Sequence, residues 1–133
     1  MAWNITPSIE ELQILGEAGL VLRDAGMMAE AREVFVGLQA LLPRNEVPEI
    51  LLGTTRFHER QFDLAIAHYR KALAVNPRSA FAYAQLAEAQ FFSNNSNEAR
   101  ANLRKAVELD PSGEFGTLAR NLTTLLEVST QGA

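Results

Sequence analysis

The sequence predicts an all-α protein, an α-solenoid of three helical hairpins that is closed by one further helix. Three prolines and three alanines each recur at a spacing of 34 residues, a period that holds one pair of helices. They are Pro43, Pro77 and Pro111, and Ala31, Ala65 and Ala99. We therefore expect a single domain over residues 1–133, with repeats at about 12–45, 46–79 and 80–113.

Within each repeat, apolar and small residues recur at steps of three and four, as in helices that pack along one face. The first helices carry Leu12, Leu15, Ala18, Gly19 and Leu22 in the first copy and Tyr83, Leu86, Ala87 and Gln90 in the third. Gly26, Arg60 and Asn94 fall at the turns inside the hairpins, where glycine and asparagine tolerate positive φ and arginine is the least suited. Each proline ends a hairpin, because the residue before a proline is pushed out of the α region.

Both ends of the stack carry helix signals. Thr6 is expected to cap the first helix, with Pro7 in its first turn and Ser8 and Glu11 as a capping box. After Pro111, a helix over about 114–128 is expected to cap the end of the stack, because its apolar residues share one face. These residues are Phe115, Leu118, Leu122, Leu125 and Leu126.

The composition narrows the range of functions. Hydrophobic residues make up 47% and charged residues 21% of the chain, which suits one globular domain. The net charge of −4 and the dispersed Lys and Arg residues argue against a nucleic-acid partner. The absence of cysteine excludes disulfides and is compatible with the cytoplasm, the expected location. No apolar run approaches the length of a membrane span, so membrane insertion is not expected.

The three copies resemble tetratricopeptide repeats over roughly residues 12–113. That family's pattern places an aromatic residue, Leu, Gly, Ala and Pro at fixed positions. The third copy matches it with Tyr83, Leu86, Ala87, Gln90, Ala99, Leu103, Ala106 and Pro111. The second copy has Glu49 and Arg56 where aromatic residues are usual, and the first has Leu38 at a position that is usually small. The resemblance implies a solenoid whose first helices line a concave inner wall.

The repeat register predicts a peptide-binding groove on that wall. The groove residues are expected to be Leu20, Val47, Ile50, Thr54, Phe57, Phe81, Ala84, Glu88, Phe91, Phe115 and Leu118, which makes the wall apolar and aromatic in its second half. Two interpretations stay open: the rings pack on one another or under the last helix, or they bind an apolar peptide segment with Phe57, Phe81 and Phe91 as anchors. Glu88 either bonds a backbone amide of the client or faces water.

Other chemistry finds no support in the sequence. His58 and His68 lack the spacing of metal ligands, so neither a metal nor another cofactor is expected. The carboxylates of the second helices suit solvated ion pairs, and no phosphate-binding loop or activated nucleophile is present. We therefore expect no enzymatic activity. The basic clamp with which some tetratricopeptide adaptors bind a terminal carboxylate is also missing from the wall.

A narrower resemblance covers roughly residues 26–127. The stretches R-Q-F-D-L-A-I-A-H-Y, A-Y-A-Q-L-A-E-A-Q-F-F, E-A-R-A-N-L and E-F-G-T-L-A-R-N-L-T-T-L-L-E are similar to the class II chaperones of type III secretion translocators. The resemblance implies a cytoplasmic chaperone that covers an apolar segment of a secreted client before export. The alternative is a scaffold or assembly subunit that joins folded proteins, which includes a component of a needle-subunit chaperone.

The oligomeric state stays open. In the chaperone family, a longer N-terminal helical segment contributes to dimerisation, and only about eleven residues precede the first repeat here. The protein is therefore expected to be either a homodimer or a monomer. Trp3 either packs on the first hairpin or lies in a second subunit.

Overall fold

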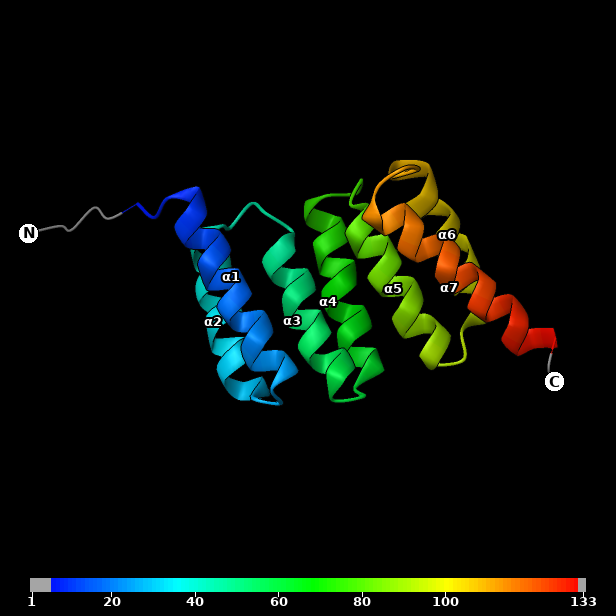
Figure 1. The fold of residues 1–133 in the computed structure, drawn as a ribbon, viewed down its shortest axis with the longest axis horizontal. Coiled ribbons are helices and arrows are strands. Elements are labelled where there is room, and N and C mark those ends of the chain that lie inside the picture. The colour runs from blue at the N-terminus through cyan, green and yellow to red at the C-terminus, as the bar shows by residue number, and fades with distance from the viewer. Residues whose placement is uncertain (1–5, 132–133) are drawn as a thin grey trace, which may run out of the picture.

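The computed structural model describes residues 6–131, with the side chains of residues 6–129, and contains seven helices within that range (Figure 1). They are α1 (Ile9–Asp24), α2 (Met28–Leu41), α3 (Val47–His58), α4 (Phe62–Val75), α5 (Ala80–Phe92), α6 (Ser96–Leu109) and α7 (Glu114–Gln131). Helices α1 to α6 form three hairpins, which confirms the all-α solenoid. The last helix begins where it was predicted and ends three residues later. Trp3 lies outside the described residues.

The hairpin turns adopt the predicted backbone conformation. Gly26, Arg60 and Asn94 have φ angles of 82°, 61° and 65°, all in the left-handed region. Arginine is disfavoured there because its Cβ approaches the following carbonyl, yet Arg60 occupies the same place in the period as the glycine and the asparagine. The period of 34 residues therefore fixes the turn geometry even where the residue type does not favour it.

The start of α1 corrects one prediction. Ser8, and not Thr6, is the N-cap, and its Oγ accepts a hydrogen bond of 3.2 Å from the backbone N–H of Glu11. The Ser8 hydroxyl also donates to the Glu11 carboxylate, at 3.3 Å. The predicted pairing of Ser8 with Glu11 is thus present. The prediction for Thr6 was wrong because the helix starts two residues later, where the Ser8 hydroxyl satisfies the free N–H group of Glu11.

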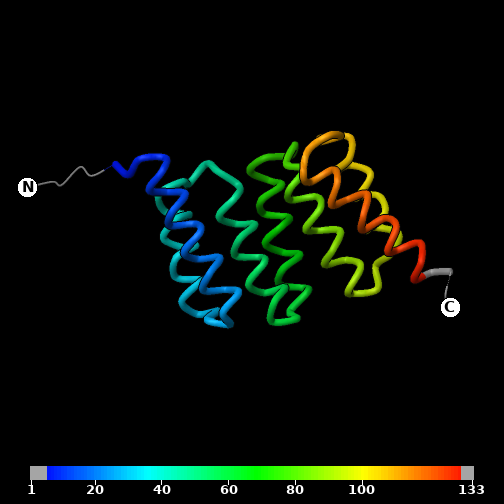
Figure 2. The backbone as a smooth tube through the Cα atoms, in the orientation of Figure 1, coloured from blue at the N-terminus to red at the C-terminus, as the bar shows by residue number. Residues whose placement is uncertain are grey.

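The stack has two unequal sides. Consecutive first helices contact one another, α1 with α3, α3 with α5 and α5 with α7, whereas among the described residues α2, α4 and α6 make no such mutual contacts. The chain is therefore most tightly packed on the side of the odd-numbered helices, which makes this side the concave one. Figure 2 shows α1 and α7 at opposite ends of the stack.

Small residues let the two helices of each hairpin cross closely. A Cβ added to Gly19 would lie 2.9 Å from Cδ1 of Phe35, and one added to Gly53 would lie 2.8 Å from Cδ1 of Tyr69. The third hairpin has Ala87 opposite the smaller Leu103 in one buried cluster. The three pairs occupy the same position in the 34-residue period. Where the first helix has alanine in place of glycine, the second helix has the smaller leucine in place of an aromatic residue.

Polar contacts join the first two repeats where the second repeat lacks its usual aromatic residues. The nearly buried Glu49 accepts a hydrogen bond from Gln39 of α2 and lies 3.0 Å from Nδ1 of His68 of α4. Arg32 of α2 pairs with Glu59, and its Nη1 donates to Oγ1 of Thr55 at 3.4 Å. Hydrogen bonds to charged groups therefore replace part of the apolar contact at this junction.

Candidate functional site

Three of the eleven predicted groove residues are buried. The side chains of Ile50 and Ala84 have no exposed surface, and Thr54 has 6%. Ile50 belongs to the cluster shared by α3, α4 and α5, while Ala84 belongs to the cluster of α5, α6 and α7. In this arrangement these three residues position the wall and offer a peptide almost no surface.

The other eight residues are half-buried: Leu20, Val47, Phe57, Phe81, Glu88, Phe91, Phe115 and Leu118. Most of them also contact a buried cluster. Leu20 and Val47 pack against the cluster of the first repeat, Phe57 and Phe81 against the second, and Phe91 and Leu118 against the third. Most residues of the predicted wall therefore pack on the hydrophobic core and expose only part of their surface to the concave side.

At the C-terminal end, two predicted rings pack together. Phe81 of α5 and Phe115 of α7 are stacked, with centroids 4.7 Å apart and an interplanar angle of 18°. Helix α7 therefore covers part of the wall over the first turns of α5. For this pair the structure has the packing arrangement that the sequence left open as the alternative to a groove.

Near the turns that follow α3 and α5, four rings form the aromatic cluster, which consists of Phe57, Phe62, Phe91 and Phe92. Phe57 lies 5.4 Å from Phe62 and 5.5 Å from Phe92 in edge-to-face contacts, and Phe62 and Phe92 are stacked at 5.8 Å. Phe91 contacts Phe92 at 5.2 Å. Such pairs each contribute about 0.5–1.5 kcal/mol beyond burial. Ring contacts in this cluster connect α3, α4 and α5.

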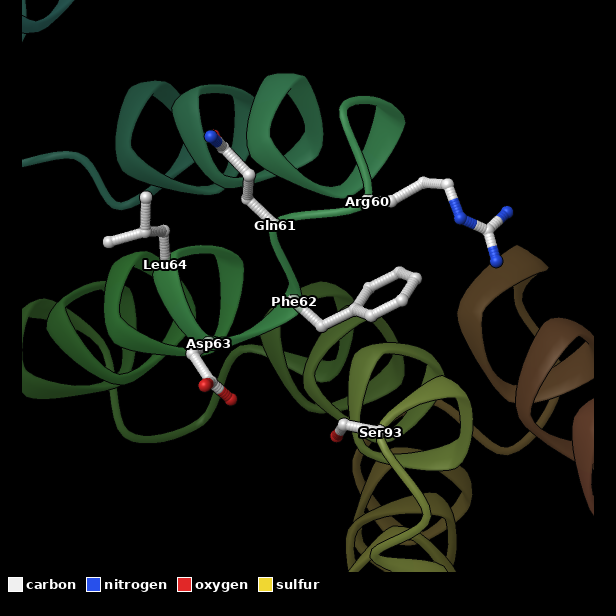
Figure 3. Close-up of a pocket in the computed structure, with 6 residues that line it drawn as sticks. All are labelled: Arg60, Gln61, Phe62, Asp63, Leu64 and Ser93. Carbon is white, nitrogen blue, oxygen red and sulfur yellow. The ribbon is translucent and has the colours of Figure 1, made fainter.

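The aromatic cluster is open to solvent. Phe92 is 46% exposed, and a pocket of about 210 Å³ lies beside it, lined by Phe57, His58, Arg60, Phe62 and Phe92. A second hollow of about 390 Å³, which shares Arg60 and Phe62 with the first, is lined by Arg60, Gln61, Phe62, Asp63, Leu64 and Ser93 (Figure 3). The guanidinium of Arg60 lies 5.8 Å from the centre of the Phe62 ring. The site thus combines apolar surface with a cation at its edge.

Phe62 and Phe92 are not among the groove residues that the sequence analysis predicted. Phe62 begins α4, whose stripe predicts a core position, and Phe92 is the last residue of α5. Their positions two residues from Arg60 and Asn94, the turn residues with positive φ, were the available signal. Side chains next to such turns lie at the rim of the stack, where neighbouring repeats leave them partly exposed.

An apolar pocket also lies at the N-terminal end, where the sequence predicted a less apolar wall. It has a volume of about 460 Å³ and is lined by Ile9, Leu12, Gln13, Gly16, Leu38, Leu42, Asn45, Val47, Pro48 and Leu51. Of the predicted groove residues it contains Val47. The expectation that the apolar surface lies in the second half was therefore incomplete, because α7 covers part of that half and no helix covers this pocket within the described residues.

Polar groups separate the two apolar regions. Arg23 of α1 donates from Nη1 to Oγ1 of Thr54 at 3.0 Å, and its Nη2 lies 2.9 Å from Oδ1 of Asp24. His58 has Nδ1 2.9 Å from the backbone oxygen of Thr54 and Nε2 3.8 Å from Oδ1 of Asp24. The charges of Arg23 and Asp24 thus balance each other on the inner side of α1 and α3.

Glu88 lies close to this polar group. Burial raises the pKa of the Glu88 carboxyl above its ordinary value, and the nearby His58 partly offsets the change. The hydroxyl of Tyr69 is buried and has no hydrogen-bond partner among the described residues, and its pKa is raised by burial first and by the charge of Glu88 second. Glu88 is half-buried, so a hydrogen-bond donor from a bound peptide would stabilise its partly desolvated carboxylate.

The described residues hold no group of three or more acidic, histidine or cysteine side chains arranged for a metal ion. Within the same residues, no helix combines the length and the apolar character that a membrane crossing requires.

The fold and the repeat pattern define the class of protein. The sequence pattern of the tetratricopeptide repeat family matches residues 56–122, half of the chain, and the protein belongs to this family. The chain is also 41% identical over 56 residues to the Protein SGT1 homolog of Oryza sativa subsp. japonica. That match covers 42% of this chain and only 15% of the rice protein.

Solved structures with similar folds cover nearly the whole chain. The type III secretion translocator chaperone SycD of Yersinia enterocolitica is 25% identical, with a TM-score of 0.78 over 94% of this chain and 96% of SycD. The first tetratricopeptide domain of Spaghetti (RPAP3), bound to an HSP90 peptide, has a TM-score of 0.74 at 21% identity. It covers 96% of this chain and 99% of that domain. The second likeness establishes the fold alone.

Proposed function

We propose that the protein is a peptide-binding chaperone that covers an apolar segment of a secreted client, most specifically a type III secretion translocator, in the cytoplasm before export. The observation that carries the proposal is the open aromatic cluster. Four phenylalanine rings meet at the rim between α3, α4 and α5, and the outermost ring, Phe92, is 46% exposed. A water-exposed aromatic surface of this kind is typical of a binding site.

The likeness to SycD supports this choice of client. The solved structures with similar folds include SycD in complex with a peptide of the translocator YopD, at 25% identity and a TM-score of 0.75. The inner side of this chain is less suited to an acidic peptide, because Arg23 is already paired with Asp24 and hydrogen-bonded to Thr54. An apolar segment fits the site better than an acidic tail does.

In the proposed complex the client lies along the concave side. An apolar side chain of the client enters the pocket beside Phe57, Phe62 and Phe92, and a second apolar side chain can reach the pocket that contains Val47. Between them, Glu88 accepts a hydrogen bond from a backbone amide of the client. An apolar footprint of about 400 Å² contributes about 10 kcal/mol before the cost of ordering is subtracted, which leaves micromolar affinity. The mechanism is passive and requires no cofactor.

Affinity capture from the native cell lysate tests the proposal. The bait proteins are the wild type, Phe92→Glu and the control Leu125→Glu, which alters a residue of α7 that is similarly exposed, at 49%. Phe92 is a better target than Phe81, because Phe81 is stacked on Phe115 and its replacement disturbs the fold. We expect the wild type and the control to recover one apolar secreted protein that Phe92→Glu does not recover.

The captured protein then supplies overlapping peptides for titration against the same three proteins. The proposal requires one apolar peptide whose affinity for Phe92→Glu is lower by about tenfold or more. Equal recovery of folded partners by all three proteins would overturn it and favour the scaffold, which acts through other surfaces.

A further inference from the structure

The outer face of α1 exposes large apolar side chains. Ile14 is 65% and Val21 is 68% exposed, and Ala18 and Ala25 on the same face are exposed as well. These four residues, which we call the open end, lie away from α2, on the side of α1 that no described helix covers. Ile14 and Val21 lie two turns apart on one face of α1, and Ala18 and Ala25 extend this face into an apolar stripe.

The repeat register identifies what normally covers this face. Ile14 and Val21 correspond to Pro48 and Thr55 in α3, both of which are buried. The helix that packs beside α3 on this side is α2, the second helix of the preceding hairpin.

The same relationship holds one repeat later. The corresponding residues of α5 are Ala82 and Ala89, which are fully buried, and α4 packs beside them. In both junctions a second helix lies on the face that α1 leaves uncovered. The open end is therefore the continuation of an interface that the chain makes twice internally.

We propose that the open end binds an amphipathic helix of a partner protein, in the place that the second helix of a preceding hairpin would take. Ile14 and Val21 are the main apolar contacts, and Ala18 and Ala25 allow the bound helix a close approach. This surface is separate from the aromatic cluster, which lies at the rim of the stack near the turns after α3 and α5.

Charge specifies the partner further. Glu10 and Glu17 lie on α1 beside Ile14, and no described side chain forms an ion pair with either. The corresponding positions in the internal junctions hold Arg44 and Leu51 in the second repeat, so the acidic residues are particular to the open end. The partner helix should carry Lys or Arg beside its apolar stripe.

The same charges argue against a second copy as the occupant. Two α1 helices packed face to face would bring Glu10 and Glu17 of one copy onto the surface that holds those of the other. Like charges across an interface weaken association. A basic helix from a different protein avoids this repulsion and forms ion pairs instead.

Titration with synthetic helices tests the proposal. Three labelled peptides of about 18 residues, a length that forms a helix on binding, are used as probes. The first has a Leu and Ala stripe flanked by Lys, the second has the same stripe flanked by Glu, and the third is a scrambled form of the first. Fluorescence anisotropy measures binding to the wild type, to Ile14→Glu/Val21→Glu and to the control Val128→Glu, which alters a residue of α7 that is 61% exposed.

We expect the Lys-flanked helix to bind the wild type and Val128→Glu equally, and Ile14→Glu/Val21→Glu at least about tenfold more weakly. The Glu-flanked and scrambled peptides should bind at least about tenfold more weakly to the wild type. A Glu10→Lys/Glu17→Lys variant should prefer the Glu-flanked helix. This reversal tests the surface even if the first double variant melts early, because it leaves Ile14 and Val21 in place.

Three results would overturn the inference. The first is equal binding of the helical and scrambled Lys peptides, and the second is unchanged binding of the Lys-flanked helix to Ile14→Glu/Val21→Glu. The third is a wild-type dimer in sedimentation that Ile14→Glu/Val21→Glu abolishes, because a second copy would then be the occupant. Phe92→Glu should bind the Lys-flanked helix as the wild type does, so failure of the proposed client site leaves this result unaffected.

Discussion

The ring of Tyr69 lies against Gly53, so closely that a Cβ on Gly53 would come within 2.8 Å of Cδ1 and closer still to Cε1. Tyr69 itself has no exposed surface. The contact joins α3 to α4 at the centre of the stack, where the second repeat packs on both neighbours. It fixes the distance between these helices.

Replacing Gly53 with alanine should therefore destabilise the protein. The methyl group would force the Tyr69 ring or α3 to move, and such overpacking costs about 1–3 kcal/mol. Urea denaturation followed by circular dichroism measures the change in the free energy of unfolding.

Gly37→Ala is the matched control. A Cβ there meets nothing within 4 Å, and Gly37 lies in the interior of α2 on its exposed side. Alanine should stabilise this helix by about 0.5–1 kcal/mol relative to glycine. Equal effects of the two substitutions would contradict the account of the close crossing.

The stacked pair Phe81 and Phe115 should hold α7 in place. Phe115→Ala removes a half-buried ring and its contact at 4.7 Å, so we expect a loss of about 2 kcal/mol in the free energy of unfolding. Leu125→Ala, on the same helix but 49% exposed, should change it by less than about 0.5 kcal/mol. Similar losses would mean that Phe115 does not anchor the helix.

The cap of α1 gives a direct comparison of two neighbouring residues. Ser8→Ala removes the hydrogen bond from the Glu11 N–H and should cost about 1 kcal/mol of stability. Thr6→Ala should have almost no effect, because Thr6 is outside the helix and exposed. Thermal unfolding monitored at pH 7 distinguishes the two, and a larger effect of Thr6→Ala would restore the cap that the sequence predicted.

The stability of the protein should depend on the charge of Glu88. Its pKa in the folded state is raised above the ordinary 4.5, chiefly by burial, so the folded state favours the neutral carboxyl. The stabilisation that the neutral carboxyl gives the folded state is fully present below pH 4.5. It is lost as the pH rises through the raised pKa of Glu88 in the folded protein. Glu88→Gln stays neutral and should therefore gain stability over the wild type as the pH rises.

Denaturation of both proteins between about pH 4 and pH 8 measures this difference. A difference that stays constant over the whole range would show that the charge of Glu88 is not destabilising.

The sequence predicted the fold because the determinants are local and repeated. The period of 34 residues located all three hairpins, and Gly26 and Asn94 marked turns whose geometry then applied to Arg60 as well. The start of α1 was harder, since Thr6 and Ser8 are both suitable caps and only the path of the chain selects between them. Helix capping depends on backbone dihedrals that residue type alone does not determine.

The site was less accessible to sequence reasoning. Register shows which helix side a residue occupies, but it does not show how far a neighbouring helix covers it. Ile50 and Ala84 were therefore expected in the groove and are buried, while Phe92 lies at the rim and is exposed. The covering of Phe81 by Phe115 depends on where α7 lies, which the repeat period does not describe. Whether the groove residues bind a client stays a prediction.

The open end also determines where the stack is weakest. In a linear array each repeat is stabilised by its neighbours, and α1 lacks a described neighbour on one side, whereas α7 covers the other end. Amide protons of α1 should therefore exchange with deuterium faster than those of α3 and α5, since local opening begins where the fewest contacts are lost. A helix bound at Ile14 and Val21 would slow this exchange and make opening of the array more cooperative.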